Sequence, residues 1–215
     1  MSDKIYNKDT VNFHTEASKR NVYLLQMEER AARDYIPIIT AEVAHFLQIL
    51  IKMNRPIRIL ELGTAIGYSS ILMAEAAGRD VEIVTIEIDE KMADEARINF
   101  KNYGIADRIN LKIGDALEII PYLRRKFDFV FIDAAKGQYP DYLKAVFELV
   151  PENGVIAADN VLYRGLVNSG DKIKHKHRTM IKSLRKYLEQ IQKHKQLMSS
   201  VIPIGDGVAL SVKLP

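Results

Sequence analysis

The sequence predicts an α/β protein built on a doubly wound, Rossmann-like sheet of seven strands, the last of which runs antiparallel. Short continuous runs of Val, Ile and Leu alternate with longer helical segments from residue 57 to residue 195. Such runs are typical of parallel strands that are covered by helices on both faces. The chain then ends in two strand-like runs joined through Gly205-Asp206-Gly207. That link is too short for a crossover, so these two strands must pair antiparallel.

Residues 1–55 are expected to form a helical segment that precedes the sheet. Apolar residues recur at intervals of three and four between residues 17 and 53, which is the spacing of amphipathic helices. Pro37 interrupts this pattern, and Thr40 followed by Glu42 indicates that a new helix starts there. Pro56 ends the segment.

Strands and helices are predicted in alternation after residue 56, with Gly104 and Pro151 ending two of the helices. No internal repeat, low-complexity tract or linker divides the chain, so residues 1–215 are predicted to form a single domain. The strands are expected at 57–63, 81–87, 109–114, 127–133, 153–160, 198–204 and 207–213, and the helices at 67–78, 90–103, 115–125, 140–150 and 172–195.

The composition excludes several classes of site. The 215 residues contain no cysteine, which rules out disulfides, thiolate–zinc sites and a thiol nucleophile. The first residues, MSDKIYNKDT, lack the apolar stretch of a signal peptide, and no apolar run reaches membrane-spanning length. A cytoplasmic protein without a membrane partner is therefore expected.

Positive charge is concentrated near the end of the chain, although the net charge is only +3. Between Lys172 and Lys195, nine Lys or Arg and three His stand against one acid, Glu189. One interpretation is the solvated face of an amphipathic helix. The other is a surface that attracts a polyanion, and the charge pattern leaves both open.

A cofactor cleft is predicted at the carboxyl ends of the strands, where doubly wound sheets bind their ligands. The first strand is followed by Gly63 and Gly67, which allow a tight turn and a close approach of the backbone to a ligand. Ala65 stands where the dinucleotide fingerprint requires its second glycine. A cofactor without a pyrophosphate is therefore favoured, and a plain tight turn is the alternative.

Acids follow the next two strands. Glu87 ends the second strand, where a carboxylate can accept hydrogen bonds from a ribose diol. Its alternative role is that of a solvated acid at a strand end. Asp115 follows the third strand and could bond an adenine amine, cap the next helix, or do both.

A divalent cation is predicted at the ends of the fourth and fifth strands. Asp133 follows the fourth strand and Asp159-Asn160 the fifth, so three hard oxygen ligands share one cleft. This set suits Mg²⁺, Ca²⁺ or Mn²⁺ and not zinc. Near such a cation Lys136 could act as a neutral amine and remove a hydroxyl proton. The alternatives are acids that only cap helices and a solvated lysine.

Together these motifs resemble the cation-dependent O-methyltransferase family, which includes catechol and caffeoyl-CoA methyltransferases. The resemblance implies a Rossmann-like methyltransferase fold with a helical N-terminal segment that covers the cleft and often forms a homodimer. It also implies S-adenosylmethionine and Mg²⁺ as cofactors, with Mn²⁺ and Ca²⁺ as alternatives to Mg²⁺. The motifs are LELGTAIGYSS (60–70), IE (86–87), GDA (114–116), DAAKGQY (133–139) and ADN (158–160), within a match over roughly residues 37–215.

The resemblance assigns roles to individual residues. It implies that Lys136 is the catalytic base and that Asp133, Asp159 and Asn160 are the metal ligands. It implies that S-adenosylmethionine is bound by Ile39, Glu61, Gly63, Ser69, Glu87, Asp115, Ala116 and Asp133.

Within the family, DAAKGQY, DNVLYRGLV (159–167) and the ending IPIGDGVALSVK are similar to bacterial enzymes that methylate 5-hydroxyuridine at the tRNA wobble position. That substrate carries two neighbouring oxygens, as a catechol does. The implied partner is a tRNA anticodon loop, with Tyr163 beside the base. The implied tRNA-binding residues are Arg164, Lys172, Lys174, Lys176, Arg178, Lys182 and Arg185.

Other functions remain alternatives. The first is an O-methyltransferase that acts on small catechols or phenols. A nucleotide-binding oxidoreductase is disfavoured by Ala65, and a catalytically silent RNA-binding module is disfavoured by the combination of Asp133, Lys136, Asp159 and Asn160.

Overall fold

The structure is a computed structural model that describes residues 21–167 and 174–215. Residues 17–20 of the predicted N-terminal helices and Lys172 of the predicted basic helix lie outside these described residues. Within them no helix is both long enough and apolar enough to cross a membrane.

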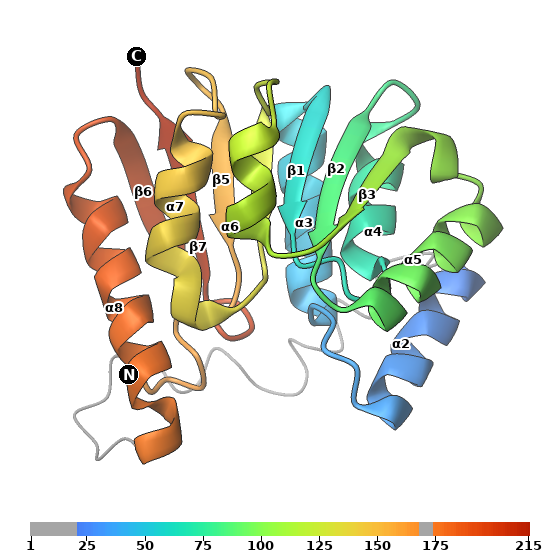
Figure 1. Ribbon diagram of the computed structural model, residues 1–215, viewed down its shortest axis with the longest axis horizontal. Coiled ribbons are helices and arrows are strands. Elements are labelled where there is room, and N and C mark those ends of the chain that lie inside the picture. Colours follow the sequence, from blue (N-terminus) through green and yellow to red (C-terminus); the bar gives the residue numbers. More distant parts are fainter. Residues whose placement is uncertain (1–20, 168–173) are drawn as a thin grey trace.

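The centre of the fold is a seven-stranded sheet in the order β3-β2-β1-β4-β5-β7-β6 (Figure 1). Strands β1 to β5 pair in parallel, and β7 lies between β5 and β6 and pairs antiparallel with both. This arrangement confirms the predicted sheet and its reversed strand. The strands are β1 (Arg58–Leu62), β2 (Glu82–Glu87), β3 (Ile109–Ile113), β4 (Phe129–Ile132), β5 (Val155–Ala158), β6 (Leu197–Ile202) and β7 (Val208–Lys213).

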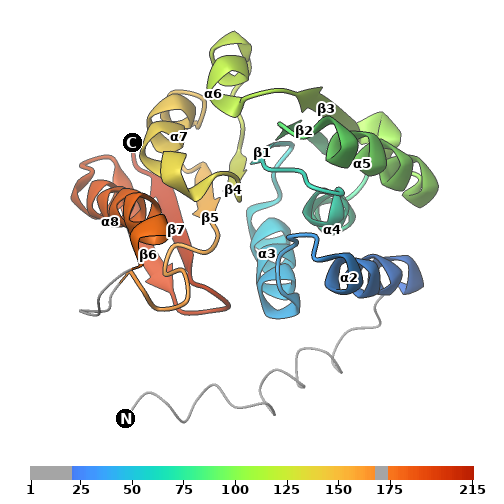
Figure 2. The same ribbon diagram turned by 60° about the horizontal axis from the view of Figure 1, so that its bottom comes forward.

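Helices cover both faces of the sheet, because alternate side chains of the central strands point to opposite apolar layers. On β1, Ile59 belongs to one buried cluster, and Leu60 and Leu62 belong to the other. Figure 2 shows α2 to α5 on one side and α6 to α8 on the other. The helices are α2 (Val22–Asp34), α3 (Ala41–Asn54), α4 (Tyr68–Ala77), α5 (Glu90–Tyr103), α6 (Ala116–Ile119), α7 (Tyr139–Phe147) and α8 (Arg178–Lys193).

The helical N-terminal segment packs on the first of these layers through α2 and α3. Leu24 and Met27 of α2 are buried in the same cluster as Ile59. At the surface, Arg30 forms a two-pronged ion pair with Glu95 of α5. These contacts hold α2 beside α4 and α5, close to the carboxyl ends of the strands. The homodimer expected through this segment stays a prediction.

The helix predicted at residues 115–125 is shorter than expected. Only α6 is α-helical, and a 3₁₀ turn over Ile120–Tyr122 follows it. Pro121 explains the early end, because proline has no N–H to donate to the carbonyl four residues earlier. As a result α6 and α7 lie over β4 and β5, whereas β1 and β2 are seen in Figure 1 without a helix in front of them.

Candidate functional site

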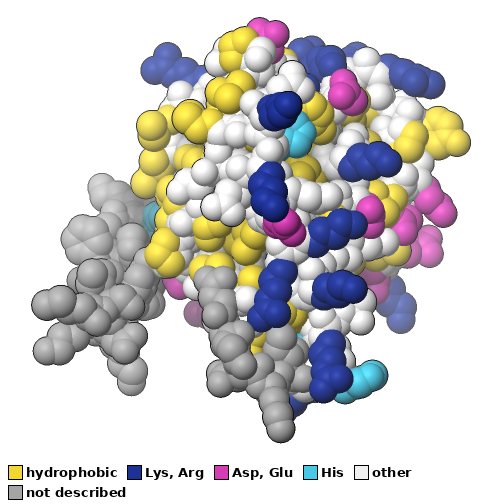
Figure 3. Space-filling model, turned by 90° about the vertical axis from the view of Figure 1, so that its left-hand side faces the viewer, with side chains coloured by type: hydrophobic (Ala, Val, Ile, Leu, Met, Phe, Trp, Pro, Cys, Tyr) yellow, Lys and Arg dark blue, Asp and Glu magenta, His cyan; other side chains and the backbone are white. Residues whose placement is uncertain are grey.

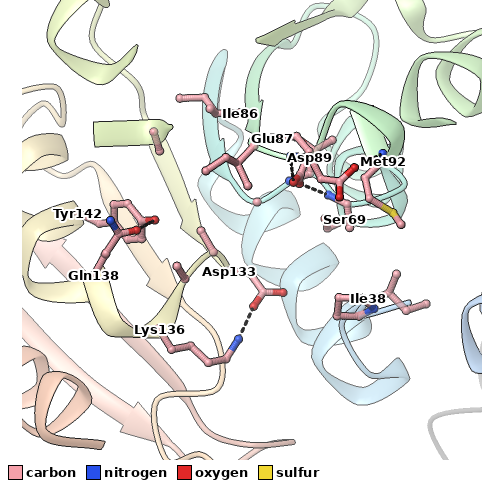
Figure 4. A pocket seen from close by; sticks show the side chains of 18 of the residues that line it. Ile38, Ser69, Ile86, Glu87, Asp89, Met92, Asp133, Lys136, Gln138 and Tyr142 are labelled. Atoms are coloured by element: carbon pink, nitrogen blue, oxygen red, sulfur yellow. Dashed lines mark hydrogen bonds and ion pairs between the residues drawn. The ribbon is translucent and has the colours of Figure 1, made fainter. Parts of the chain in front are cut away.

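A cavity of about 480 Å³ opens at the carboxyl ends of the parallel strands, where β1 lies between β2 and β4. This is the switch point of the sheet, because the chain runs from β1 outward through β2 to β3 and then returns to β4 on the other side. The loops after all five parallel strands line the cavity, together with residues 37–39 between α2 and α3 (Figure 4). The cavity is therefore the predicted cleft.

Glycine is required twice in the loop after β1. Gly63 has a φ of +95°, and a Cβ there would lie 2.4 Å from the Asp133 carbonyl oxygen. Gly67 has a φ of +86°, and a Cβ there would meet the Phe100 ring at 2.4 Å. Both positions combine a left-handed conformation with close packing, which only glycine allows. The loop can therefore cross the end of β4 and leave the cavity open.

Glu87 fixes the same loop from the end of β2. Its Oε2 accepts hydrogen bonds from the N–H groups of Thr64 at 3.1 Å and Ala65 at 2.7 Å, and its Oε1 accepts one from Asp89 at 2.9 Å. Glu87 also lines the cavity. The alternative of a solvated acid at a strand end is wrong. Oε1 accepts only this one hydrogen bond from Asp89 among the described residues, so its second lone pair can accept one from a ligand hydroxyl.

Glu61 is the predicted cofactor contact that the structure places elsewhere. It is fully buried and is not among the residues that line the cavity. It accepts hydrogen bonds from the hydroxyls of Ser69, Ser70 and Thr85. Because it points into the protein, Glu61 holds the start of α4 against β1 and β2 and reaches the cavity only through Ser69, which does line it.

Burial raises the pKa of Glu61 from 4.5 to about 7, against the opposing effect of the three hydroxyl donors. A carboxyl whose pKa is raised by folding stabilises the folded state most when it is protonated. This stabilisation is therefore lost as the pH rises from about 4.5 to about 7. Glu61→Gln removes this titration. Between pH 4.5 and 7.5 its free energy of unfolding should therefore decrease less than that of the wild type, by up to about 3 kcal/mol. Urea unfolding at pH 4.5, 6 and 7.5 measures the free energy of unfolding of both proteins. If the two proteins show the same dependence on pH, the prediction is wrong.

The remaining predicted cofactor residues lie around the cavity. Ile39 lines it from the segment before α3, Ser69 from the first turn of α4, and Asp115 and Ala116 from the start of α6. Asp115 is also the N-cap of α6, since its side chain accepts the N–H of Leu117 at 2.8 Å. The capping role predicted for Asp115 is confirmed, and a contact with a base stays a proposal.

The acidic end of the cavity begins with Asp133 and Lys136. Asp133 directly follows β4, and Lys136 begins a 3₁₀ turn three residues later. This spacing brings Lys136 Nζ to 3.3 Å from Asp133 Oδ1, and Figure 4 shows the amine pointing at the carboxylate. Burial raises the pKa of Asp133, although the neighbouring Lys136 partly offsets this increase.

Asp159 and Asn160 complete this end from β5. Asn160 lines the cavity, whereas Asp159 is buried beside it and only 1% exposed. Asp159 Oδ1 accepts the Asn160 N–H at 2.6 Å. Burial, followed by the negative charge of Asp133, raises the pKa of Asp159 to about 7. The negative charge of Asp133 therefore disfavours ionisation of Asp159.

These three side chains fit a hard divalent cation. Two carboxylates and an amide supply the oxygen donors that Mg²⁺, Mn²⁺ and Ca²⁺ prefer, and a cation would relieve the repulsion between the buried acids. In the described part of the chain no three His, Cys, Asp or Glu side chains gather as a metal site. A site here therefore depends on the Asn160 amide and on ligands from outside the protein.

Tyr139 joins the two strand ends that carry the acids. It is fully buried, and its hydroxyl lies 2.9 Å from the Asp159 carbonyl and 3.3 Å from the Ile132 carbonyl. For Tyr139→Phe we expect about tenfold weaker Mn²⁺ binding, because groups that orient metal ligands typically contribute this much. Titration with Mn²⁺ followed by electron paramagnetic resonance measures it. Tyr142→Phe removes a hydroxyl bonded to Gln138 and is the matched control. Equal effects in the two variants would exclude this positioning role.

Several residues of the cavity were not predicted from the sequence. Gln138 and Tyr142 form one wall, and Tyr142 donates to Gln138 Oε1 at 2.7 Å. Asp89 and Met92 line the opposite side, near Glu87 (Figure 4). Asp89 is the N-cap of α5 and accepts two backbone N–H groups. A polar residue two positions after the strand-end Glu87 was the available signal, whereas nothing local marked Met92 or Tyr142.

The segment after Asn160 leads from the cavity toward α8. Tyr163 and Arg164 adopt left-handed conformations, and the Arg164 guanidinium lies 5.7 Å from the centre of the Tyr163 ring. The ring of His177 lies 5.7 Å from the same ring. The Arg164 N–H donates to Asp206 at 3.3 Å. The exposed Arg164 guanidinium and the Tyr163–His177 pair thus follow directly after Asn160, a predicted ligand of the metal ion.

The predicted basic helix is amphipathic. The α-helix α8 begins at Arg178, after a 3₁₀ turn over His175–His177. Lys and Arg side chains form a column on this side of the molecule (Figure 3). Arg185 also donates to the Val167 carbonyl at 2.8 Å, which joins α8 to the segment after β5. The predicted tRNA-binding residues on this side that the structure describes are all exposed, and they are Lys174, Lys176, Arg178, Lys182 and Arg185.

Comparisons with known proteins point to one family. A family model described as O-methyltransferase matches residues 14–214. The chain is 38% identical over 128 residues to a catechol O-methyltransferase of Mycobacterium tuberculosis, covering 59% of this chain and 58% of that protein. It is 30% identical to caffeoyl-CoA O-methyltransferase 1 of Eucalyptus globulus, covering 80% of this chain and 72% of that protein. The O-methyltransferase TomG of Streptomyces achromogenes, solved in complex with SAM, superposes with a TM-score of 0.87 at 27% identity, covering 100% of both chains.

Proposed function

The chain belongs to the O-methyltransferase family, and from this premise we propose that it methylates the 5-hydroxyl of 5-hydroxyuridine at the wobble position of tRNA. The enzyme class is O-methyltransferase of the catechol and caffeoyl-CoA type. The proposal adds S-adenosylmethionine as methyl donor, Mg²⁺ as the cation and 5-methoxyuridine as the product. Mn²⁺ and Ca²⁺ are the alternative cations.

The apolar and acidic part of the cavity is proposed to bind S-adenosylmethionine, which TomG carries in its crystal structure. This cofactor supplies an electrophilic methyl group on a positively charged sulfur. Glu87 would accept hydrogen bonds from the ribose, and Asp115 one from the adenine amine. Ile39 and Met92 line the same cavity and would exclude water from it. The absence of a pyrophosphate in this cofactor agrees with Ala65 in the loop after β1.

The other end of the cavity is proposed to hold the cation through Asp133, Asp159 and Asn160. A divalent cation there would act as a Lewis acid and favour the ionised form of a bound hydroxyl. The protein ligands leave positions for a substrate that offers two neighbouring oxygens. In 5-hydroxyuridine these are the 5-hydroxyl and the 4-carbonyl, which correspond to the two oxygens of a catechol.

The transfer step forms one bond and breaks one. The 5-oxygen attacks the methyl carbon, an oxygen–carbon bond forms, and the carbon–sulfur bond breaks to leave S-adenosylhomocysteine. We assign the hydroxyl proton to Lys136 Nζ, which lines the cavity beside Asp133 and would accept the proton as a neutral amine. Fixing the two reactants in one orientation contributes much of the rate, since effective molarities of oriented reactants correspond to about 7–11 kcal/mol.

The observation that supports an RNA substrate is the basic surface beside this site. Arg164 and the Lys and Arg side chains of α8 are exposed, and they would contact phosphates of the anticodon stem. Tyr163, packed against His177, offers a ring on which a flipped base can stack. A small catechol requires neither feature.

The test is methyl transfer to tRNA that contains 5-hydroxyuridine, with S-adenosylmethionine labelled in its methyl group. We expect label in 5-methoxyuridine with Mg²⁺ present and at least about a hundredfold less with a chelator. A catalytic cation typically lowers the activation free energy by several kcal/mol. Absence of transfer in the presence of Mg²⁺ would refute the RNA substrate.

The second candidate is an enzyme that acts on small catechols or phenols. It is favoured by the similarity to a catechol O-methyltransferase and a caffeoyl-CoA O-methyltransferase. Salt distinguishes the candidates, because binding to RNA phosphates weakens steeply as the salt concentration rises. The small-molecule candidate is favoured if free catechol is methylated as efficiently as tRNA and if neither activity depends on salt.

A further inference from the structure

The strongest unassigned feature is a second groove at the opposite end of the sheet. Its volume is about 510 Å³, which is within the usual range for small-molecule sites. It is lined by the starts of β1, β2 and β3 and by residues 122–125 of the segment before β4. The groove exists because α6 and its 3₁₀ turn end at Tyr122, which leaves this part of the sheet without a covering helix (Figure 1).

Sequence alternation makes the groove polar. Leu60 and Leu62 of β1 and Ile86 of β2 belong to the apolar cluster beneath α6 and α7. Arg58 lies two residues before Leu60 on β1, so its side chain is on the same face of the sheet, and it lines the groove. The apolar layer thus ends where the helices end.

The groove carries an excess of positive charge. Two of its lining residues are acids, Glu82 and Asp107, and one of these is already paired, because Arg125 Nη1 lies 2.8 Å from Glu82 Oε2. The cationic lining residues are Arg58, Arg108, Lys112, Arg124 and Arg125. Excess positive charge in a concave surface favours an anionic ligand.

Arg58 has an unsatisfied donor. Its Nε is buried and has no hydrogen-bond partner among the described residues. Buried polar groups are nearly always paired, so the Arg58 guanidinium keeps hydrogen-bonding capacity that the described residues do not use. Arg124 also lines the groove; it is exposed and forms no ion pair within residues 21–167 and 174–215.

From the orphaned Arg58 donor and the charge of the groove we infer that it binds a small phosphorylated ligand, with Arg58 and Arg124 as the phosphate-binding residues. Guanidinium groups match phosphate oxygens in pairs of parallel hydrogen bonds, which favours phosphate over a simple halide. Tyr122, whose side chain is 77% exposed at the rim, provides a ring for a base. Inorganic polyphosphate and a nucleoside polyphosphate share this chemistry and are the two sources to be distinguished.

The first experiment is calorimetric titration of the full chain with tripolyphosphate at low ionic strength. Tripolyphosphate has no adenosine and therefore does not compete for the methyl-donor cavity. We expect saturable binding, with an affinity at least about tenfold lower in the double variant Arg58→Gln, Arg124→Gln. Each hydrogen bond between charged groups typically contributes about a factor of ten to the affinity. Absence of binding at millimolar tripolyphosphate would overturn the inference.

Two further variants separate the groove from general charge effects and from misfolding. Glu82→Gln removes an acid and releases Arg125, so tripolyphosphate should bind more tightly, a gain that a damaged fold cannot produce. The triple variant Lys52→Gln, Lys101→Gln, Lys144→Gln neutralises three exposed cations that line neither the groove nor the basic surface of α8, and it should bind as the wild type does. Equal losses in this control and in the arginine variant would overturn the assignment to the groove.

Titration with ATP distinguishes the two sources. The protein is first saturated with S-adenosylhomocysteine so that ATP cannot enter the methyl-donor cavity. If the ligand is a nucleotide, ATP binds more tightly than tripolyphosphate, and Tyr122→Ala removes the difference. If it is a polyphosphate, both bind alike and Tyr122→Ala changes neither. Binding of tripolyphosphate does not depend on methyl transfer, so failure here leaves the proposed function intact.

Discussion

Asp159→Ala is expected to reduce methyl transfer by about a thousandfold, since a catalytic cation contributes several kcal/mol of transition-state stabilisation. Asp159 is buried beside Asn160, and this burial, followed by the negative charge of Asp133, raises its pKa. Its loss removes one of the two carboxylates that would hold the cation. Binding of S-adenosylhomocysteine should stay within about twofold of the wild type, because Asp159 does not line the cavity. Initial rates and calorimetry measure the two quantities.

Controls separate this role from a role in folding. Asp159→Asn keeps the size of the side chain and an oxygen that can accept the Asn160 N–H, but it removes the charge. It should also lose most of the activity, because a neutral amide is a weaker ligand for Mg²⁺. Asp80→Ala changes an exposed acid far from the cavity and should be neutral. Near-normal activity of Asp159→Ala in the presence of a chelator would disprove the role of the cation.

Reversing the charge at Lys174, Lys176 and Arg178 is expected to reduce activity on tRNA by at least about tenfold and to leave activity on a small catechol nearly unchanged. These residues are exposed at the start of the basic surface, next to the Tyr163–His177 pair. The dependence of tRNA affinity on salt should also become weaker, by about one unit of slope for each phosphate that the protein no longer neutralises.

The matched control places the same three charge reversals on another side of the molecule, at Lys52, Arg79 and Lys101, which are all exposed. This control changes the net charge equally and should retain most of the tRNA activity. If the two triple variants lose equal activity, the effect comes from net charge alone. If tRNA and catechol activities decrease together, the basic surface does not bind RNA.

The sheet could be predicted because its signals are local. Continuous apolar runs and the short Gly205-Asp206-Gly207 link define the strands and the final antiparallel pair, and both are present in the structure. The helix at residues 115–125 was predicted too long because a single proline outweighed a favourable pattern. Pro121 lies in the middle of the predicted helix and ends it early.

The candidate site was predictable where strand ends carry the chemistry. Asp133, Asn160, Glu87 and Asp115 line one cavity because parallel strands end at the same edge. Glu61 stays a prediction as a cofactor residue, because in the structure it accepts hydrogen bonds from a buried hydroxyl cluster and does not line the cavity. Residues such as Met92 and Tyr142 come to the cavity from helices whose packing is set by distant parts of the chain, which local sequence does not encode.

The most direct measurement is mass spectrometry of tRNA nucleosides from cells that lack this protein. The proposed function predicts that 5-methoxyuridine disappears and 5-hydroxyuridine accumulates, and that the wild-type gene restores the methylated nucleoside whereas Asp159→Ala does not. An unchanged level of 5-methoxyuridine in those cells would contradict it.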